Sequence, residues 1–121
     1  MLSVTDPDPI PPPPDRFNLA SYVLAQAGAQ PDKIALAILD RSGAERWSYA
    51  RLNQTVGGTA TGLLQQGLEP GDRVLLRLGN SIEFPLAFLG AITAGLVPVP
   101  TSAQLTEPEV ARLIDIITPR L

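Results

Sequence analysis

Apolar residues recur along the chain at alternating helical and extended spacings, which predicts an α/β fold. A helix is expected from Asn18, which can cap it, to Gly28. An apolar run over residues 34–39 is followed by an Asp-Arg-Ser-Gly turn and then by Glu-Arg-Trp-Ser at residues 45–48. Two short segments around such a turn predict an antiparallel β-hairpin.

A long helix is expected next, with Ser48 as its N-cap and Gly67 at its end. Three glycines, Gly57, Gly58 and Gly62, lie inside it, and each costs up to about 1 kcal/mol relative to alanine in a helix interior. They match neither a G-x-G-x-x-G pattern nor a loop ending in Gly-Lys-Ser/Thr, so they are not a phosphate loop. We expect them to allow the close approach of a neighbouring backbone.

The following segments have the order of a βαβ unit. Pro-Gly at positions 70–71 predicts a type II turn, and a strand is expected over residues 73–79. Asn80 with Glu83 then forms a capping-box pattern for an apolar helix, and residues 97–99 form a second strand. The strands should pair in parallel through a right-handed crossover, and proline in the second strand predicts an edge position or a short pairing.

An uncharged stretch covers residues 84–106, and about 20 apolar residues suffice to cross a bilayer. The Val-Pro-Val-Pro sequence at 97–100 cannot continue a helix, however, and the residues after it are polar. A buried helix followed by a buried strand explains the stretch better than a membrane span. The N-terminus carries no basic region followed by an apolar one, so we expect no signal peptide.

A last helix is predicted by the capping-box pattern of Thr106 and Glu109. Its apolar residues share one face: Val110, Leu113, Ile114 and Ile117. In an alternating α/β pattern another strand would begin after this helix, so the order of elements is interrupted at residue 121.

Composition narrows the possible chemistry. The 121 residues fit one domain, and 45% hydrophobic residues suffice for a core. The chain has no cysteine and no histidine, which excludes disulfides, Cys/His zinc sites and histidine acid–base catalysis. The lack of cysteine fits a reducing compartment, and we expect a cytoplasmic location.

Charge and proline are concentrated at the N-terminus. The net charge of −3 arises from three aspartates before residue 16, and the neutral remainder has no basic stripe, so nucleic-acid binding is not expected. Six of the 13 prolines lie in the first 14 residues, and we expect residues 1–15 to form a flexible Pro-rich tail. The prolines at 11–14 could instead dock in an aromatic groove of a partner, but a solvated tail is the simpler interpretation.

Few side chains are candidates for chemistry. Glu107 and Glu109 lie at a helix start, where the helix dipole favours carboxylates, and this structural role outweighs a metal site. The loop at 79–81 (Gly-Asn-Ser) follows a predicted parallel strand, the place where open sheets bind ligands, although Asn80 is already expected to cap a helix. The serines have no histidine to activate them, and the only lysine, Lys33, lies in a predicted loop. We therefore assign no catalytic, cofactor-binding or metal-ligating residue.

Several segments in series resemble a known family. They are Trp-Ser-Tyr-Ala-Arg-Leu at 47–52, Gly-Leu-Glu-Pro-Gly-Asp-Arg-Val at 67–74, Asn-Ser-Ile-Glu-Phe at 80–84, and Leu-Gly-Ala-Ile-Thr-Ala-Gly-Leu-Val-Pro-Val-Pro at 89–100. Together they resemble the opening of AMP-forming acyl-CoA synthetases of the adenylate-forming superfamily. Residues 31–35 and 105–109 fit the same pattern. The sequence of residues 94–100 is most similar to the aryl-CoA, benzoate-like branch.

The resemblance implies that residues 16–121 are the truncated N-terminal α/β subdomain of a ligase. The full-length family enzyme converts a carboxylate and ATP to an acyl-adenylate and then to a CoA thioester, with ATP, Mg²⁺ and CoA as cofactors. The family's phosphate loop, its adenine and ribose motifs and its catalytic lysine lie beyond the matched region. The resemblance therefore transfers no catalytic residue, and no cofactor is expected in this fragment.

Two hypotheses follow. The first is an N-terminal fragment of an acyl- or aryl-CoA ligase, inactive alone, whose partner is the rest of the ligase polypeptide. The second is a short non-catalytic interaction protein built on the same scaffold. In both cases an exposed sheet edge predicts a homo-oligomer. A nucleotide-binding regulator is a third, weaker possibility, and the acid substrate is not readable from these residues.

Overall fold

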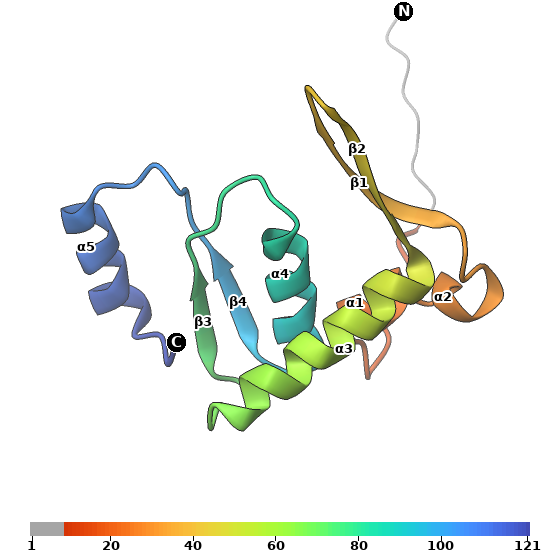
Figure 1. Ribbon diagram of the computed structural model, residues 1–121. Coiled ribbons are helices and arrows are strands. Elements are labelled where there is room, and N and C mark those ends of the chain that lie inside the picture. Colours follow the sequence, from red (N-terminus) through yellow and green to blue (C-terminus); the bar gives the residue numbers. More distant parts are fainter. Residues whose placement is uncertain (1–8) are drawn as a thin grey trace, which may run out of the picture.

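Helices and strands alternate along residues 9–121, the part of the chain that the computed structural model describes (Figure 1). This order confirms the predicted α/β class. The elements are α1 (Leu19–Val23), α2 (Gln26–Ala29), β1 (Ile34–Asp40), β2 (Gly43–Ser48), α3 (Tyr49–Gln65), β3 (Arg73–Leu76), α4 (Glu83–Thr93), β4 (Val97–Pro100) and α5 (Glu107–Ile117).

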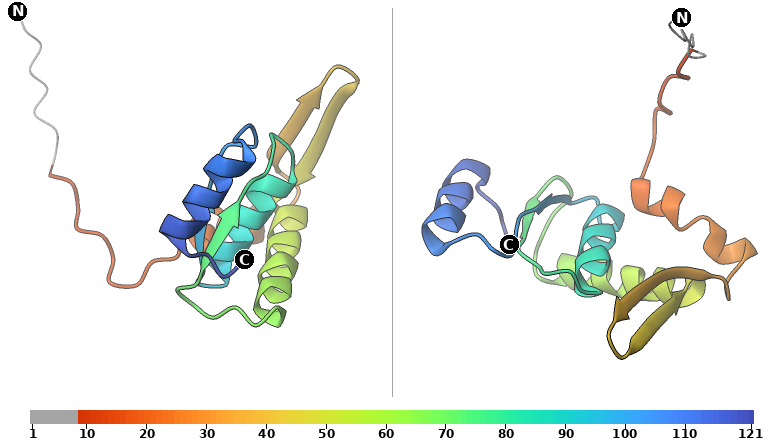
Figure 2. Two further views of the ribbon diagram at one scale, coloured as in Figure 1. Left: turned by 90° about the vertical axis from the view of Figure 1, so that its left-hand side faces the viewer. Right: turned by 90° about the horizontal axis from the view of Figure 1, so that it is seen from above.

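The predicted hairpin is confirmed, and β1 and β2 pair antiparallel. Its turn is held by Asp40, whose carboxylate accepts the backbone N–H groups of Ser42 at 2.6 Å and of Gly43 at 3.0 Å. The hairpin projects away from the other elements (Figures 1 and 2). Only its base enters the core, where Trp47 of β2 is 6% exposed.

The single helix predicted after Asn18 is wrong, because the chain forms two short helices there. Asn18 does cap α1, and its Oδ1 accepts the Ser21 N–H at 3.1 Å. Between α1 and α2, Leu24 leaves helical geometry with φ −92° and ψ 5°. Leu24 is 6% exposed and lies in one apolar cluster with Trp47. The break therefore places the Leu24 side chain in the core. This burial depends on tertiary contacts, which a local helix pattern does not reveal.

Helix α3 joins the two apolar clusters of the molecule. The Ser48 hydroxyl caps it by accepting the Arg51 N–H at 3.2 Å, and Gly67 follows it with φ +83°, both as predicted. The first cluster consists of Leu24, Trp47, Leu52 and Val56, and the second of Ala60, Leu68, Val74, Leu76, Ala91, Ala94 and Leu96. Because α3 contributes to both, it connects the hairpin to the parallel strands (Figure 1).

The predicted role of the glycines in α3 is wrong. A Cβ at Gly57, Gly58 or Gly62 would meet no atom within 4 Å, so no neighbouring backbone approaches them. The close approach occurs instead at buried Gly90 of α4, where a Cβ would lie 2.6 Å from Cγ2 of Thr59. Gly90 is thus the residue that allows α4 to pack against α3.

Strands β3 and β4 pair in parallel from Arg73 with Val97 to Leu76 with Pro100, which confirms the predicted pairing. Helix α4 covers one face through a cluster that includes Val74, Leu76 and Ala91. Helix α5 lies on the opposite side of the strands (Figure 1). The strand β3 ends at Leu76, three residues earlier than predicted.

The predicted helix cap at Asn80 is wrong. Helix α4 begins at Glu83 with Ile82 as N-cap, and no side chain caps it. The backbone instead bends before the helix, with the Ser81 N–H bonded to the Gly79 carbonyl at 2.9 Å and the Phe84 N–H bonded to the Ser81 carbonyl at 3.3 Å. This bend moves the helix start past the capping-box position.

Residues 9–17 are exposed and form neither helix nor strand, and they extend away from the helices (Figure 2). The rest of the predicted tail, residues 1–8, lies outside the described residues, so its flexibility stays a prediction. Among residues 9–121, no helix combines the length and apolar character that a membrane crossing requires.

Candidate functional site

Of the two acidic candidates, Glu109 has a structural role, and Glu107 lies beside it in the first turn of α5. The Glu109 carboxylate accepts the backbone N–H of Thr106 at 2.8 Å and its hydroxyl at 2.7 Å, which confirms the predicted capping box. These two hydrogen bonds, the backbone bond first, lower the pKa of Glu109 below its ordinary value. Residues 9–121 contain no cluster of three or more His, Cys, Asp or Glu side chains that could hold a metal ion.

The serine candidates are also engaged locally. Ser48 caps α3, and the Ser42 hydroxyl donates to the Asp40 carboxylate at 2.5 Å. The Ser42 hydroxyl, and then the Ser42 N–H, lower the pKa of Asp40. A hydrogen bond from the Ser81 side chain is the main cause that lowers the pKa of Glu83. These bonds hold turns and helix ends, so the residues do not converge on one reacting centre.

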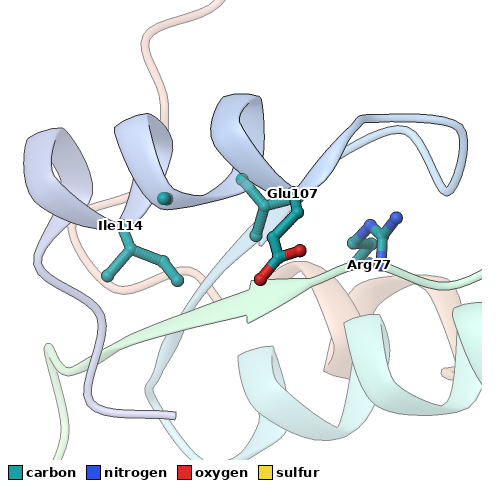
Figure 3. Close-up of a pocket in the computed structure, with 5 residues that line it drawn as sticks. Arg77, Glu107 and Ile114 are labelled. Atoms are coloured by element: carbon teal, nitrogen blue, oxygen red, sulfur yellow. The ribbon is translucent and has the colours of Figure 1, made fainter.

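A concave site lies in a groove between α5 and the carboxyl end of β3 (Figure 3). Its volume is about 470 Å³, and it is lined by Arg77, Glu107, Val110, Ala111 and Ile114. In Figure 3 the labelled Ile114 and Arg77 lie toward opposite ends of the groove, with Glu107 between them. The predicted ligand loop, residues 79–81, follows Arg77 in the chain and does not line the groove.

The groove exists because α5 does not pack closely against the strands. No residue of α5 is buried, although the helix is strongly amphipathic, and Ile114 remains 45% exposed. The Arg77 guanidinium donates to the Leu105 carbonyl at 2.6 Å, which ties β3 to the loop before α5. The sequence indicated the apolar face of the last helix. The groove beside that face follows only from the position of α5 relative to β3.

The lining of the groove limits its chemistry. Three of its five residues are apolar, and the other two are Arg77 and Glu107. Arg77 is already bonded to a backbone carbonyl. The groove therefore presents the apolar side chains of α5 beside one arginine and one glutamate.

Comparison with known proteins places this architecture. A family model described as "AMP-binding enzyme" matches residues 23–121. Salicyl-AMP ligase / salicyl-S-ArCP synthetase of Mycobacterium tuberculosis is 42% identical over 79 residues, which are 64% of this chain and 14% of that protein. Medium-chain fatty-acid–CoA ligase of Escherichia coli is 33% identical over 98 residues, which are 81% of this chain and 17% of that protein.

Solved structures agree with the sequence relatives. A benzoate CoA ligase from Burkholderia xenovorans LB400 superposes with a TM-score of 0.76 and 30% identity, over 87% of this chain and 21% of that one. The hairpin, the parallel strands and their helices therefore define the N-terminal α/β portion of acyl- and aryl-CoA ligases. The chain belongs to the AMP-binding enzyme family. It spans less than a fifth of the length of the two sequence relatives.

Proposed function

We propose that this chain is the N-terminal scaffold of an ATP-dependent acyl- or aryl-CoA ligase. The whole ligase would join a carboxylate to ATP, release pyrophosphate, and transfer the acyl group from AMP to the CoA thiol. The family match over residues 23–121 supports this reaction class. ATP, Mg²⁺ and CoA would be held by the rest of the ligase polypeptide, which is the partner we propose, and the location would be cytoplasmic.

One observation carries the proposal of a scaffold role. Asp40 holds a turn, Ser48 and Glu109 hold helix starts, and three of the five residues that line the groove are apolar. Such a segment can position neighbouring elements, but it has no group placed to activate a carboxylate. The isolated chain should therefore release no pyrophosphate from ATP and Mg²⁺ with any of a panel of carboxylic acids.

A chimera tests the role directly. Residues 23–121 would replace the matching segment of the Escherichia coli medium-chain fatty-acid–CoA ligase, which is 33% identical. We expect the chimera to form acyl-CoA, because the scaffold is interchangeable, whereas the ligase without this segment should be inactive. A soluble, folded chimera without activity would refute the proposal. Turnover by the isolated 121-residue chain would refute its inactivity.

The alternative is a non-catalytic interaction protein that associates through a sheet edge. The N–H groups of Val97 and Thr101 in and after β4 point toward β3, where they bond to the carbonyls of Asp72 and Leu76 at 2.8 Å. By alternation, the outward positions are Pro98 and Pro100, which carry no N–H. The outer edge of β4 is therefore a poor template, and pairing between copies would use the β1–β2 hairpin. Light scattering at high concentration distinguishes a hairpin-mediated dimer from a monomer.

A further inference from the structure

Four consecutive prolines at residues 11–14 lie in an exposed segment before the first helix. Residues 9–17 are all exposed, and Ile10 is 90% exposed. The segment forms neither helix nor strand and extends away from the helices (Figure 2). Within the described chain, no backbone hydrogen bond involves a residue of this segment. Its carbonyl groups therefore remain accessible to the hydrogen-bond donors of a partner.

Proline geometry restricts the conformation of this segment. The proline ring fixes φ at about −65° and disfavours the helical region for the preceding residue. Residues 10–13 each precede a proline, so both restrictions act through the run. They favour polyproline II, an extended left-handed helix with three residues per turn and no internal hydrogen bonds. Because covalent geometry already restricts the free chain, binding in this conformation costs little backbone entropy.

The period of three sorts the side chains of a polyproline II helix into three edges. Two edges carry only apolar side chains and one cation: Ile10, Pro13 and Arg16 on the first edge, and Pro11 and Pro14 on the second. The third edge consists of Pro9, Pro12 and Asp15. The carboxylate of Asp15 is thus directed away from the first two edges. A tail that is only solvated requires no such sorting, whereas a ligand for a groove does.

Residues 15 and 16 form a bend in the structure, which interrupts the extended conformation before Arg16. No backbone hydrogen bond within residues 9–121 holds this bend. Extending it therefore breaks no backbone hydrogen bond of the described chain, and it brings Arg16 into line with Ile10 and Pro13.

We infer that residues 10–16 bind an SH3-type partner domain, whose groove is lined by aromatic side chains and ends in an acidic pocket. One aromatic pocket takes Ile10 and Pro11, and a second takes Pro13 and Pro14. Arg16 pairs with the acidic pocket through charge-assisted hydrogen bonds. Because Arg16 follows both apolar pairs in the chain, the segment fits the groove in one direction only. This inference does not rest on the proposed ligase function.

Calorimetric titration of the 121-residue chain tests the inference, with a panel of SH3 domains that accept Pro-x-x-Pro-x-Arg peptides as probes. We expect saturable binding with one domain per chain. Arg16→Glu should weaken this binding by about 10-fold or more, because it removes the charge-assisted bonds and places a like charge in the acidic pocket. If no domain of the panel binds at millimolar concentration, the inference is overturned. It is also overturned if the Arg16→Glu chain binds as tightly as its parent.

Two adjacent prolines provide a matched comparison. Pro11→Ala removes a ring that contacts the groove and should weaken binding by about 5-fold or more. Pro12→Ala removes the same ring from the solvent edge and should weaken binding by less than about 2-fold. Both variants should unfold at the same urea concentration as the parent, because residues 9–17 lie outside the two apolar clusters. Equal losses of affinity in the two variants would overturn the inference.

Nuclear magnetic resonance locates the contact on the chain. The amide signals of Ile10, Asp15 and Arg16 should shift on titration, whereas the indole signal of the buried Trp47 should not. Shifts confined to the helices and the hairpin would overturn the inference. A WW domain is the control partner, because it also binds Pro-rich segments in an aromatic-lined groove. Tighter binding of the chain to this domain, unaffected by Arg16→Glu, would contradict the acidic pocket.

Discussion

Replacing Gly90 by alanine is expected to destabilise the protein, although alanine is normally the better helix former. The added Cβ would lie 2.6 Å from Cγ2 and 2.8 Å from Cβ of Thr59, and 3.4 Å from the backbone nitrogen of Ala60. The Thr59 Cβ is fixed to the α3 backbone, and the Thr59 hydroxyl is bonded to the Thr55 carbonyl at 2.9 Å. The two helices must therefore move apart to admit the methyl group.

The magnitude follows from two opposing effects. Overpacking a core costs about 1–3 kcal/mol, and replacing glycine by alanine in a helix returns about 0.5–1 kcal/mol. We expect the free energy of unfolding to fall by about 1–2 kcal/mol for Gly90→Ala, which lowers the melting temperature by about 4–8 °C. Gly58→Ala is the matched control, because its Cβ would meet nothing within 4 Å. This control should gain about 0.5–1 kcal/mol.

Urea unfolding measures both effects through the fluorescence of Trp47, the only tryptophan of the chain. A double-mutant cycle with Thr59→Gly, which removes both crowding carbons, should recover about 1 kcal/mol or more of the loss as coupling energy. If Gly90→Ala and Gly58→Ala stabilised the protein equally, the close α3–α4 contact would be refuted. Additive behaviour in the cycle would assign the loss to a site other than Thr59.

Three further predictions concern caps and edges. Asn18→Ala should lower the free energy of unfolding in urea by about 1–2 kcal/mol, since it removes the α1 cap and the hydrogen bond from Nδ2 to the Ile92 carbonyl. Asn18→Asp keeps the cap and should lower it less. Because the pKa of Glu109 is lowered below its ordinary value of 4.5, its ionised carboxylate stabilises the fold at pH values above 4.5. This stabilisation is lost as the pH falls below 4.5 and through the lowered pKa, so Glu109→Gln should make stability depend less on pH in that range. Pro98→Val restores an outward N–H on β4 and should increase self-association in sedimentation experiments; an unchanged monomer would contradict the blocked edge.

Local rules predicted the features that neighbouring residues decide. Ser48, the Thr106–Glu109 pair and Gly71, with φ +91°, satisfy a helix start or a turn within a few residues of sequence. The capping-box pattern at Asn80 is equally local, but the cap that it predicted does not form. Backbone hydrogen bonds in a bend at residues 79–82 take its place. A pattern shows which residues can cap a helix, and the competing local hydrogen bonds decide which of them does.

Features set by distant contacts were not predictable from one sequence. Gly90 gave no signal to distinguish it from the three glycines of α3, because its contact with Thr59 depends on how two helices cross. The break at Leu24 likewise depends on the cluster around Trp47. The apolar face of α5 was predicted, but the groove required the position of α5 relative to β3. The family resemblance came from motifs in series, and it carried no site residue.

Calorimetric titration of the isolated 121-residue chain with Mg²⁺·ATP and with AMP tests the central claim most directly. If the chain is scaffold and the adenylation machinery lies in the rest of the ligase, neither nucleotide should produce binding heat at millimolar concentration. Saturable binding of AMP or ATP to a monomer, lost on substitution of its own side chains, would contradict the account.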